Sequence, residues 1–583
     1  MIKTLAAQIK EFKKESVLTP IFMVLEVVFE TLIPLMMASI IDDGVEAGDM
    51  RHIYLVGACM IASALGGLFC GIMGGKFGAR ASTGFARNLR QAMFDNIQTF
   101  SFSNLDKFST AGLVTRMTTD VTNIQMAYQM LLRICFRAPI SMVCAMSMAF
   151  FINARLASIY MVALVLLAIV LFFIISRAMK YFQMAFPKYD ELNASVQENV
   201  SAIRVVKAYV REDYETSRLK KASQAIYDIF LKAEKNVVLN MPVMQFTVYS
   251  CILLISWMGA KMIVQRELTT GELMSLMAYC MNILMSLMMV AMIFVMMSMS
   301  IASARRISEV LDEKSDLTNP ENPVYDIPDG EIEFRNVDFS YYKDENKNVL
   351  QEINLKIRAG ETVGIIGGTG SSKTTLVNLI SRLYDVTKGS VMVGGHDVRE
   401  YDMDSLRGQV AVVLQKNVLF SGTVLDNLRW GDENATEEEC RRVCRLACAD
   451  EFIEKMPEGY NTYIEQGGSN VSGGQKQRLC IARALLKKPK ILILDDSTSA
   501  VDTATDAKIR QALAQEIPDT TKLIIAQRVS SVQHADHIIV MEEGRINGYG
   551  THEELIETNE IYREVYESQT SGGGDFDEKV EVV

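Results

Sequence analysis

The sequence lacks several features that would place it among common classes of soluble protein. None of its ten cysteines forms a Cys-x-x-Cys pair and six lie in apolar stretches, so no disulfide framework is indicated. It has no excess of positive charge: 59 Lys and Arg against 70 Asp and Glu give a net charge of −11, which argues against a nucleic-acid-binding protein. No small-residue cleavage pattern follows the first apolar run, so no cleavable signal peptide is expected.

Long apolar runs, in contrast, are abundant in the first 300 positions. Each is long enough, at about 1.5 Å rise per residue, to cross roughly 30 Å of hydrocarbon. We therefore predict a membrane-embedded half with these spans: Val17 to Ile41, Ile53 to Gly75, Ile134 to Ile152, Leu156 to Ile175, Pro242 to Val264 and Leu273 to Ile301.

The loops between these spans are of two kinds. Those after the first, third and fifth spans are short, whereas those after the second and fourth are long and rich in Lys and Arg. The positive-inside bias predicts that the long loops and both termini are cytoplasmic. The long loops have apolar residues at helical spacing, so we expect the helices to continue into the cytoplasm, with tips near Thr118 to Ile124 and Tyr209 to Glu215.

Two features within the spans are candidates for substrate contact. Glu26 and Glu30 lie four residues apart on one helix face, and a carboxylate at membrane depth is costly enough to suggest a function. The alternative is that they face an aqueous cavity or bond to neighbouring helices. The last span has ten Met and no charge, which suits either a surface accepting many apolar shapes or ordinary helix packing. The candidate Met residues are Met281, Met285, Met288 and Met292.

The second half contains the stretch "GGTGSSKTT", a phosphate-binding loop with one unusual residue. It lies between a strand-like segment and an amphipathic helix, the context that G-x-x-x-x-G-K-[ST] requires. Lys373 would reach the terminal phosphates, and the Thr374 hydroxyl would ligate Mg²⁺. Ser372 replaces the last Gly of the pattern but keeps its backbone N–H, so ATP binding is expected to survive. The predicted nucleotide-contacting residues of this loop are Gly367, Gly368, Thr369, Gly370, Ser371, Ser372, Lys373, Thr374 and Thr375.

Two further segments complete a nucleotide site. "KILILDDSTSAVD" reads as a buried parallel strand ending in carboxylates, of which Asp495 would hold Mg²⁺. "VSGGQKQRLCIARALL" places a pair of glycines at a helix N-terminus, where backbone N–H groups favour an anion.

With these motifs the chain resembles the ATP-binding cassette (ABC) family. "VSGGQ" is similar to the family's signature, and the phosphate loop, the Walker B strand, Gln415 in "VVLQKN" and "STSAVD" occur in the family's order. The membrane half is similar to six-span exporters. The resemblance implies an all-α transmembrane domain of the type IV exporter fold, with long cytoplasmic extensions, followed by an α/β P-loop domain.

The resemblance also assigns roles to individual residues. It implies that Tyr341 stacks on adenine, that Gln415 senses Mg²⁺ and the membrane domain, and that Asp502 belongs to the catalytic site. In two facing cassettes, the signature of one would complete the ATP site of the other. The implied signature contacts are Ser472, Gly473, Gly474 and Gln475, and the implied Mg²⁺ ligands are Thr374, Gln415 and Asp495.

Two departures from the family pattern affect catalysis. The family's general base is a Glu after the Walker B Asp, whereas this chain has Asp496, which is one methylene shorter. The family's switch His is replaced by Gln527, which cannot carry a proton. Together they suggest a site that retains ATP more than it hydrolyses it, in a subunit whose partner supplies the Glu and the His.

The sequence thus predicts a transmembrane domain over 1–312, a linker over 313–328, a cassette over 329–568 and a flexible acidic tail over 569–583. The expected function is one subunit of a heterodimeric, ATP- and Mg²⁺-dependent exporter of amphiphilic or drug-like compounds in a bacterial plasma membrane, with the cassette in the cytoplasm. Export of lipid or peptide, and a nucleotide-gated channel or regulator, are the alternatives.

Overall fold

The computed structural model describes residues 1–342, 344, 347–496 and 501–571. The chain divides into two compact units. Unit 1 comprises Met1–Thr99 and Phe108–Glu313, and unit 2 comprises Phe100–Lys107 and Lys314–Val583.

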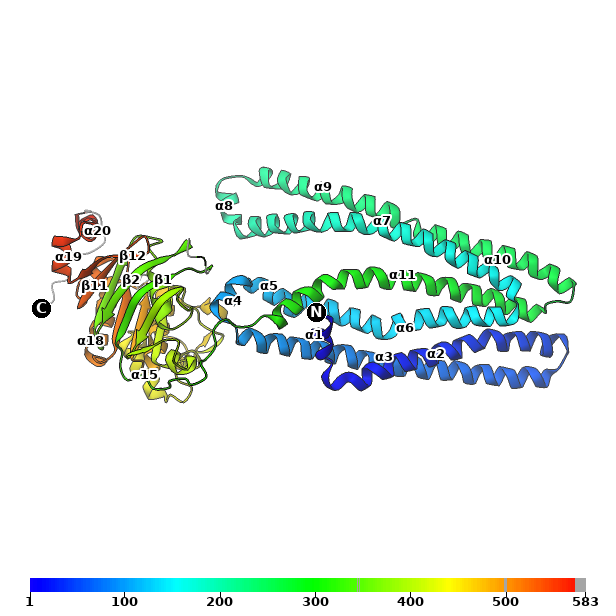
Figure 1. The fold of residues 1–583 in the computed structure, drawn as a ribbon, viewed down its shortest axis with the longest axis horizontal. Helices are drawn as coiled ribbons and strands as arrows, with labels where there is room; N and C mark the ends of the chain where they lie inside the picture. Colours follow the sequence, from blue (N-terminus) through cyan, green and yellow to red (C-terminus); the bar gives the residue numbers. More distant parts are fainter. Residues whose placement is uncertain (343, 345–346, 497–500, 572–583) are drawn as a thin grey trace. The chain divides into compact units, whose positions relative to one another are not determined.

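Unit 1 consists of long helices. Helix α2 lies along α3, and α7 lies along α9 (Figure 1). The elements are α1 (Ile2–Ala7), η1 (Lys10–Phe12), α2 (Lys13–Ser39), η2 (Ile40–Glu46), α3 (Met50–Gln98), α5 (Thr110–Thr115), η3 (Arg116–Asp120), α6 (Val121–Ile152), α7 (Ala154–Ser201), α8 (Ile203–Ala208), α9 (Glu212–Val237), α10 (Asn240–Val264) and α11 (Thr270–Asp312).

The predicted six spans are confirmed. Within the described part of the chain, six helical stretches are long and apolar enough to cross a membrane. Each overlaps one predicted span, and several extend well beyond it, since α3 and α7 have 49 and 48 residues. The extra length continues these helices past the apolar core, as the helical periodicity of the long loops predicts.

The short loops end at residues that cap the next helix. Asp49 accepts hydrogen bonds from the N–H groups of Arg51 and His52 at the start of α3. Asn153 does the same for α7, and Thr269 forms a capping box with Glu272 at the start of α11. Because these caps satisfy N–H groups that have no partner within the helix, the chain reverses within a few residues.

The predicted position of the first loop tip is wrong. The segment from Thr118 to Ile124 lies in a continuous helical stretch, the π-helix η3 followed by α6. The polar residues interrupt the apolar pattern because Asp120, only 1% exposed, accepts hydrogen bonds from Ser303 and Arg306 of α11. The chain reverses earlier, around α4 (Phe102–Lys107). At the second reversal, α8 precedes Tyr209, so the predicted range covers only the end of the turn.

The described residues of unit 2 form three β-sheets. A six-stranded sheet has the order β12-β11-β3-β10-β9-β6, a four-stranded sheet the order β2-β1-β4-β5, and β7 pairs with β8. The strands are β1 (Ile332–Phe339), β2 (Leu350–Ile357), β3 (Thr362–Gly367), β4 (Lys388–Val393), β5 (His396–Asp397), β6 (Val410–Val413), β7 (Gly422–Thr423), β8 (Tyr463–Ile464), β9 (Ile491–Asp495), β10 (Thr521–Ile525), β11 (His537–Glu542) and β12 (Arg545–Gly550).

Helices cover the six-stranded sheet. Strands β6, β9, β10, β3 and β11 are parallel, and every residue of β9 and β10 is buried, as expected for strands with both faces covered. The helices are α12 (Lys373–Ile380), α13 (Met403–Gln409), α14 (Val424–Leu428), α15 (Glu437–Leu446), α16 (Asp450–Ile453), η5 (Gly459–Asn461), η6 (Gln466–Gly468), α17 (Gly473–Leu486), α18 (Thr503–Glu516), η7 (Val529–Ser531), α19 (His552–Thr558) and α20 (Glu560–Ser571).

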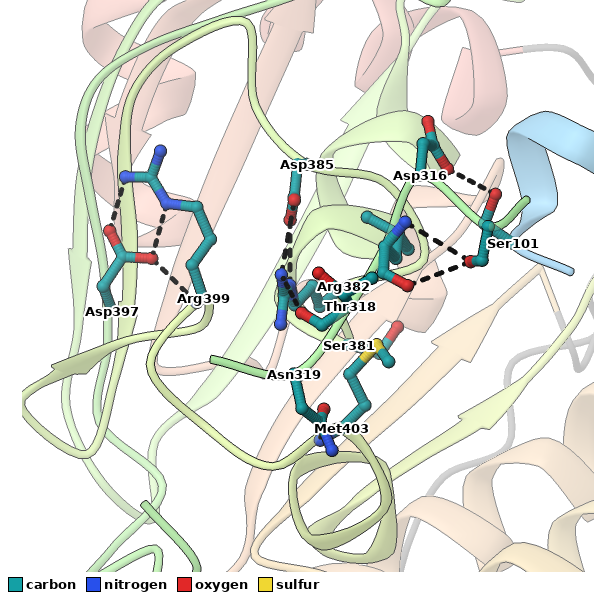
Figure 2. Close-up of polar contacts among 12 residues, drawn as sticks. Ser101, Asp316, Thr318, Asn319, Ser381, Arg382, Asp385, Asp397, Arg399 and Met403 are labelled. Atoms are coloured by element: carbon teal, nitrogen blue, oxygen red, sulfur yellow. Dashed lines mark hydrogen bonds and ion pairs between the residues drawn. The ribbon is translucent and has the colours of Figure 1, made fainter. Parts of the chain in front are cut away.

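The short helix α4 packs within unit 2. The Ser101 and Ser103 hydroxyls donate to the Asp316 carboxylate, and the Tyr384 hydroxyl donates to Asp106 Oδ2 over 2.7 Å (Figure 2 shows Ser101 and Asp316). Burial and the neighbouring Asp106 both raise the pKa of Tyr384. The chain reversal at α4 is therefore held by side-chain hydrogen bonds.

Residues of the predicted linker also contact the cassette. The guanidinium of Arg382 donates to the Thr318 carbonyl and to Asp385, and Asn319 accepts from the Met403 N–H (Figure 2). At the other end, the predicted acidic tail falls outside the described residues from position 572, while 569–571 belong to α20.

Candidate functional site

The phosphate loop connects the C-terminal end of β3 to the N-terminus of α12, at the edge of the sheet where parallel strands bind ligands. A Cβ on Gly367 would lie 2.3 Å from the Met541 carbonyl oxygen, so only Gly fits at the start of the loop. Gly370 has a φ of +85°, which also favours Gly. The loop backbone therefore packs closely against Met541 at Gly367 and makes a left-handed turn at Gly370, as expected of a loop that binds phosphate.

Ser372 occupies a backbone conformation that suits glycine. Its φ of 71° and ψ of 25° are left-handed, and its side chain makes no capping hydrogen bond to α12. A residue with a Cβ pays about 1 kcal/mol or more for this conformation. The loop thus keeps its geometry at an energetic cost that the family's glycine would avoid.

Lys373 lies inside the loop. Its Nζ donates to the carbonyls of Gly367 and Gly368, each over 2.8 Å, and to the Ser371 hydroxyl over 3.2 Å. Burial lowers the pKa of the ammonium, while Asp495 and Asp496 oppose that shift. The ammonium therefore lies against the loop backbone, and its contact with the terminal phosphates of a nucleotide stays a prediction.

Thr374 and Asp495 provide oxygen donors suited to Mg²⁺. The Thr374 hydroxyl lies 2.9 and 3.1 Å from the two Asp495 carboxylate oxygens, and Asp495 is 2% exposed at the end of β9. Burial raises the pKa of Asp495, while the Thr374 hydrogen bond acts against that shift. A hydroxyl and a carboxylate on adjacent elements fit a hard cation that also bonds to phosphate.

Asp496 and Gln527 are directly hydrogen-bonded. The Gln527 Nε2 donates to Asp496 Oδ2 over 2.8 Å, and the Gln415 Nε2 approaches the same oxygen at 3.4 Å. Asp496 is 9% exposed and has a φ of 48°, so its carboxylate extends from a strained backbone. The two residues that depart from the family pattern thus contact one another, and one oxygen of the Asp496 carboxylate accepts from the Gln527 amide.

Tyr341 lies beside the helix of the phosphate loop. Its ring packs edge-on against Phe339 and Tyr384, with centroids 4.9 and 5.1 Å apart, and its hydroxyl is 2.9 Å from Thr375 Oγ1. Tyr341 as a residue is 39% exposed. Stacking on adenine stays a prediction, and this position is compatible with it.

The signature residues form a helix cap. Ser472 and Gln475 make a reciprocal capping box at the start of α17, and Ser472 and Gly473 are exposed to solvent. Asp502 caps α18 by accepting from the Thr505 N–H over 2.9 Å, and this bond lowers the pKa of its carboxyl. Thr374 of the phosphate loop contacts Asp495, and both Gln415 and Gln527 contact the adjacent Asp496. The bonds described for Ser472 and Asp502, in contrast, are local to the starts of their own helices.

In unit 1, Glu26 and Glu30 both lie near an arginine that our sequence reasoning missed. The Arg137 guanidinium on α6 is 2.6 Å from Glu30 and 3.5 Å from Glu26. Arg137 lies within the predicted third span, and a charge at membrane depth needs a partner, so the sequence could have indicated an ion pair with Glu26 or Glu30. The bond to a neighbouring helix, one of our alternatives, is therefore present, and substrate contact stays a prediction.

The candidate Met residues differ in exposure along α11. Met281, Met285 and Met292 are exposed in this single chain, whereas Met288 is partly buried against the apolar core of unit 1. The spacing of four and seven residues places the three exposed side chains on one face of the helix. Flexible thioethers therefore form an apolar stripe on that face.

Comparison with known proteins assigns the chain to a family. Residues 17–288 match the ABC transporter transmembrane region, and residues 350–499 match the ABC transporter family. The chain is 35% identical over 549 residues to YfiB of Bacillus subtilis, an uncharacterised ABC transporter ATP-binding protein, with 94% of this chain and 95% of the relative covered. It is 33% identical over 495 residues to an ATP-dependent lipid A-core flippase of Desulfotalea psychrophila, with 84% and 85% covered.

Among solved structures, a bacterial Atm1-family ABC exporter with ATP bound has the same fold. The TM-score is 0.83 at 23% identity, with 96% of this chain and 99% of the exporter chain covered. The expected fold class, six membrane-spanning helices followed by a nucleotide-binding domain, is confirmed. The chain belongs to the ABC transporter family and has the exporter fold, with the transmembrane and ATP-binding regions in one polypeptide.

Proposed function

We propose that this chain is one subunit of a heterodimeric ATP-driven exporter and that its own nucleotide site retains ATP more than it hydrolyses it. The observation that carries the proposal is the hydrogen bond between Gln527 and Asp496. A general base needs a free carboxylate oxygen within reach of the attacking water. Asp496 is one methylene short, and its Oδ2 accepts from an amide that cannot take up a proton.

The ATP-holding side chains support retention. Lys373 lies within the loop, and Thr374 and Asp495 form a pair suited to Mg²⁺. When bound, Mg²⁺ would neutralise part of the phosphate charge. These groups provide binding without requiring Asp496 or Gln527.

The signature "VSGGQ" is proposed to act on the partner's site. Ser472 and Gly473 are exposed at the N-terminus of the 14-residue helix α17, so their N–H groups can meet a phosphate from outside the chain. The partner, a different half-transporter, would supply the Glu and the His. Two copies of this chain would instead combine two intact signatures with two impaired bases.

The transported compounds are proposed to be amphiphilic and drug-like. The exposed Met stripe on α11 and the carboxylates near Arg137 support a surface for molecules with an apolar body and a charged group. The Lys-rich N-terminus and basic long loops support a cassette in the cytoplasm, and the bacterial relatives support a bacterial plasma membrane.

Lipid export is a second candidate, favoured by one observation. Two relatives, from Desulfotalea psychrophila and Hahella chejuensis, are lipid A-core flippases at 33% and 32% identity. A lipid also has an apolar body and a charged head, so the same surface would suit it.

Reconstitution with a second half-transporter that has the Glu and the His at the matching positions tests both candidates. Vesicles with both chains should accumulate a fluorescent cationic amphiphile with ATP, and the amphiphile should stimulate hydrolysis. Movement of a fluorescent phospholipid alone would support the lipid candidate. Solute flux that needs ATP binding but no hydrolysis would contradict both and support a gated channel. Full activity of this chain without a partner would overturn the heterodimer.

A further inference from the structure

The side chain of Gln569, on the C-terminal helix α20, is bonded to the backbone on both sides of Arg528. The Val529 N–H donates to Gln569 Oε1 over 2.8 Å, and the Gln569 Nε2 donates to the Gln527 carbonyl over 2.9 Å. Arg528 is extended, with a φ of −99° and a ψ of 131°. The Gln569 side-chain amide therefore pairs with one backbone N–H and one backbone carbonyl of this extended segment, as the backbone of a neighbouring β-strand would.

Helix α20, which carries Gln569, is packed against the rest of unit 2. Tyr562 is fully buried, and its hydroxyl lies 2.7 Å from Nδ1 of His552 on α19. Ile561 and Val565 pack against the apolar core beneath the sheet. The position of Gln569 is thus set by the packed core of unit 2.

The Gln527 segment connects this support to the nucleotide site. The Gln527 backbone is held by Gln569, and its side chain reaches Asp496 Oδ2. Arg528 adds a 3.4 Å contact to the Thr503 hydroxyl at the start of α18. A continuous set of hydrogen bonds therefore joins α20 to the carboxylate beside the predicted attack position.

We propose that Gln569 is a positioning residue that holds Gln527 against Asp496 and so sets the hydrolysis rate of this site. It touches neither nucleotide nor metal and acts through the Gln527 segment. The inference rests on the proposed function in one respect, that Asp496 is the group beside the hydrolysed phosphate. The sequence alone does not indicate this role, because Gln569 belongs to none of the motifs and a Gln on an exposed helix face is common.

A double-mutant cycle on the full-length chain in lipid nanodiscs tests the proposal. Gln569→Leu keeps the side-chain size and removes both hydrogen bonds, and Gln569→Glu keeps only acceptors. Because either variant frees Gln527 to move away from Asp496 Oδ2, each should raise the single-turnover hydrolysis rate severalfold, with MgATP affinity within about twofold of the native chain. In a Gln527→Ala background, Gln569→Leu should have no further effect, since the pathway to Asp496 is already absent.

Thr570→Ala is the matched control, because the Thr570 hydroxyl bonds to the Tyr566 carbonyl within α20 and leaves the Gln527 segment untouched. It should leave rate and affinity unchanged. An equal gain from Gln569→Leu in both backgrounds, or no gain in the native background, would overturn the proposal.

Amide hydrogen exchange provides a readout that does not need hydrolysis. Exchange at Val529 should be faster in Gln569→Leu than in the native chain, and unchanged exchange would overturn the proposal. Failure of the proposed function would be seen separately, as rapid turnover or absent ATP binding in the native chain itself.

Discussion

The Nε2 of Gln527 lies 2.8 Å from the Oδ2 of Asp496, so the two residues that depart from the family pattern form one hydrogen-bonded pair. The Gln527 amide donates and the Asp496 carboxylate accepts, so each residue provides the hydrogen-bonding partner of the other. The pair therefore behaves as a unit, and changing one member alone should not restore a hydrolytic site.

The purified chain should bind MgATP and hydrolyse it slowly, at less than about 1 per second, because the phosphate and Mg²⁺ groups remain while base and switch are replaced. Replacing both together, Asp496→Glu with Gln527→His, should raise turnover at least tenfold, since a positioned base contributes about 10²- to 10⁴-fold. Phosphate release measures the rate. Asp496→Glu alone is the control and should gain little, and a full gain from that single change would contradict the paired interpretation.

Removal of Mg²⁺ should weaken nucleotide retention. Thr374 and Asp495 are the residues that would hold the cation, and without it the buried Asp495 carboxylate would repel the nucleotide. We expect at least a tenfold rise in the dissociation constant for ATP in EDTA, measured by equilibrium binding. Asp495→Asn should reduce this Mg²⁺ dependence, and an unchanged dependence would place the metal elsewhere.

Ser372→Gly should stabilise the cassette. The left-handed φ of 71° penalises a Cβ, and its removal should recover about 1 kcal/mol, seen as a higher Tm with ATP affinity equal or better. Thr369→Gly in the same loop is the control, because Thr369 does not have a positive φ. A lower Tm for Ser372→Gly would show that the serine side chain stabilises the loop.

Asp120→Asn should destabilise unit 1. Asp120 is 1% exposed and accepts from Ser303 and Arg306, so losing its charge weakens a buried charged hydrogen bond by roughly 1–3 kcal/mol. Thermal unfolding in detergent measures the change. Glu309→Gln, which weakens the half-exposed pair with Arg116, should cost less than about 1 kcal/mol. Equal effects of the two variants would argue against a special role for Asp120.

Glu26→Gln with Glu30→Gln should change the ranking of transported compounds, affecting cations most, if these carboxylates contact substrate. The double change also leaves Arg137 without its carboxylate partners, so a stability loss is expected whatever the function. Adding Arg137→Gln should recover that stability without restoring the native ranking. Transport assays and Tm on the same samples separate the two effects, and a native ranking in the triple variant would indicate a structural role only.

In the assembled pair, Ser472→Arg should slow hydrolysis about 10²-fold or more, because the signature is proposed to face the partner's ATP and removing one such donor typically costs that much. Asp496→Glu in the same assembly should have a smaller effect. Single-turnover hydrolysis compares them. The reverse result, a severalfold gain from Asp496→Glu and no loss from Ser472→Arg, would show that the phosphate loop of this chain, and not that of the partner, forms the hydrolytic site.

The sequence by itself determined the membrane spans and the phosphate loop, which depend on residues close together along the chain. Six apolar runs predict six spans because hydrocarbon selects for length and composition, and the loop between an apolar strand and a helix predicts a phosphate cradle because glycine spacing sets its backbone. The replacements at Asp496 and Gln527 are likewise visible in sequence, since they stand at fixed places in ordered motifs.

Tertiary structure alone decided which side chains meet. Asp120 interrupts an apolar pattern and was interpreted as a turn, yet it is buried because Arg306, far along the chain, lies against it. Arg137 and Gln569 show the same limit: each acts through a partner more than forty residues away, on another element. The spacing of apolar and polar residues indicates which residues share a face of one helix or strand. Contacts between different elements depend on how the whole chain packs.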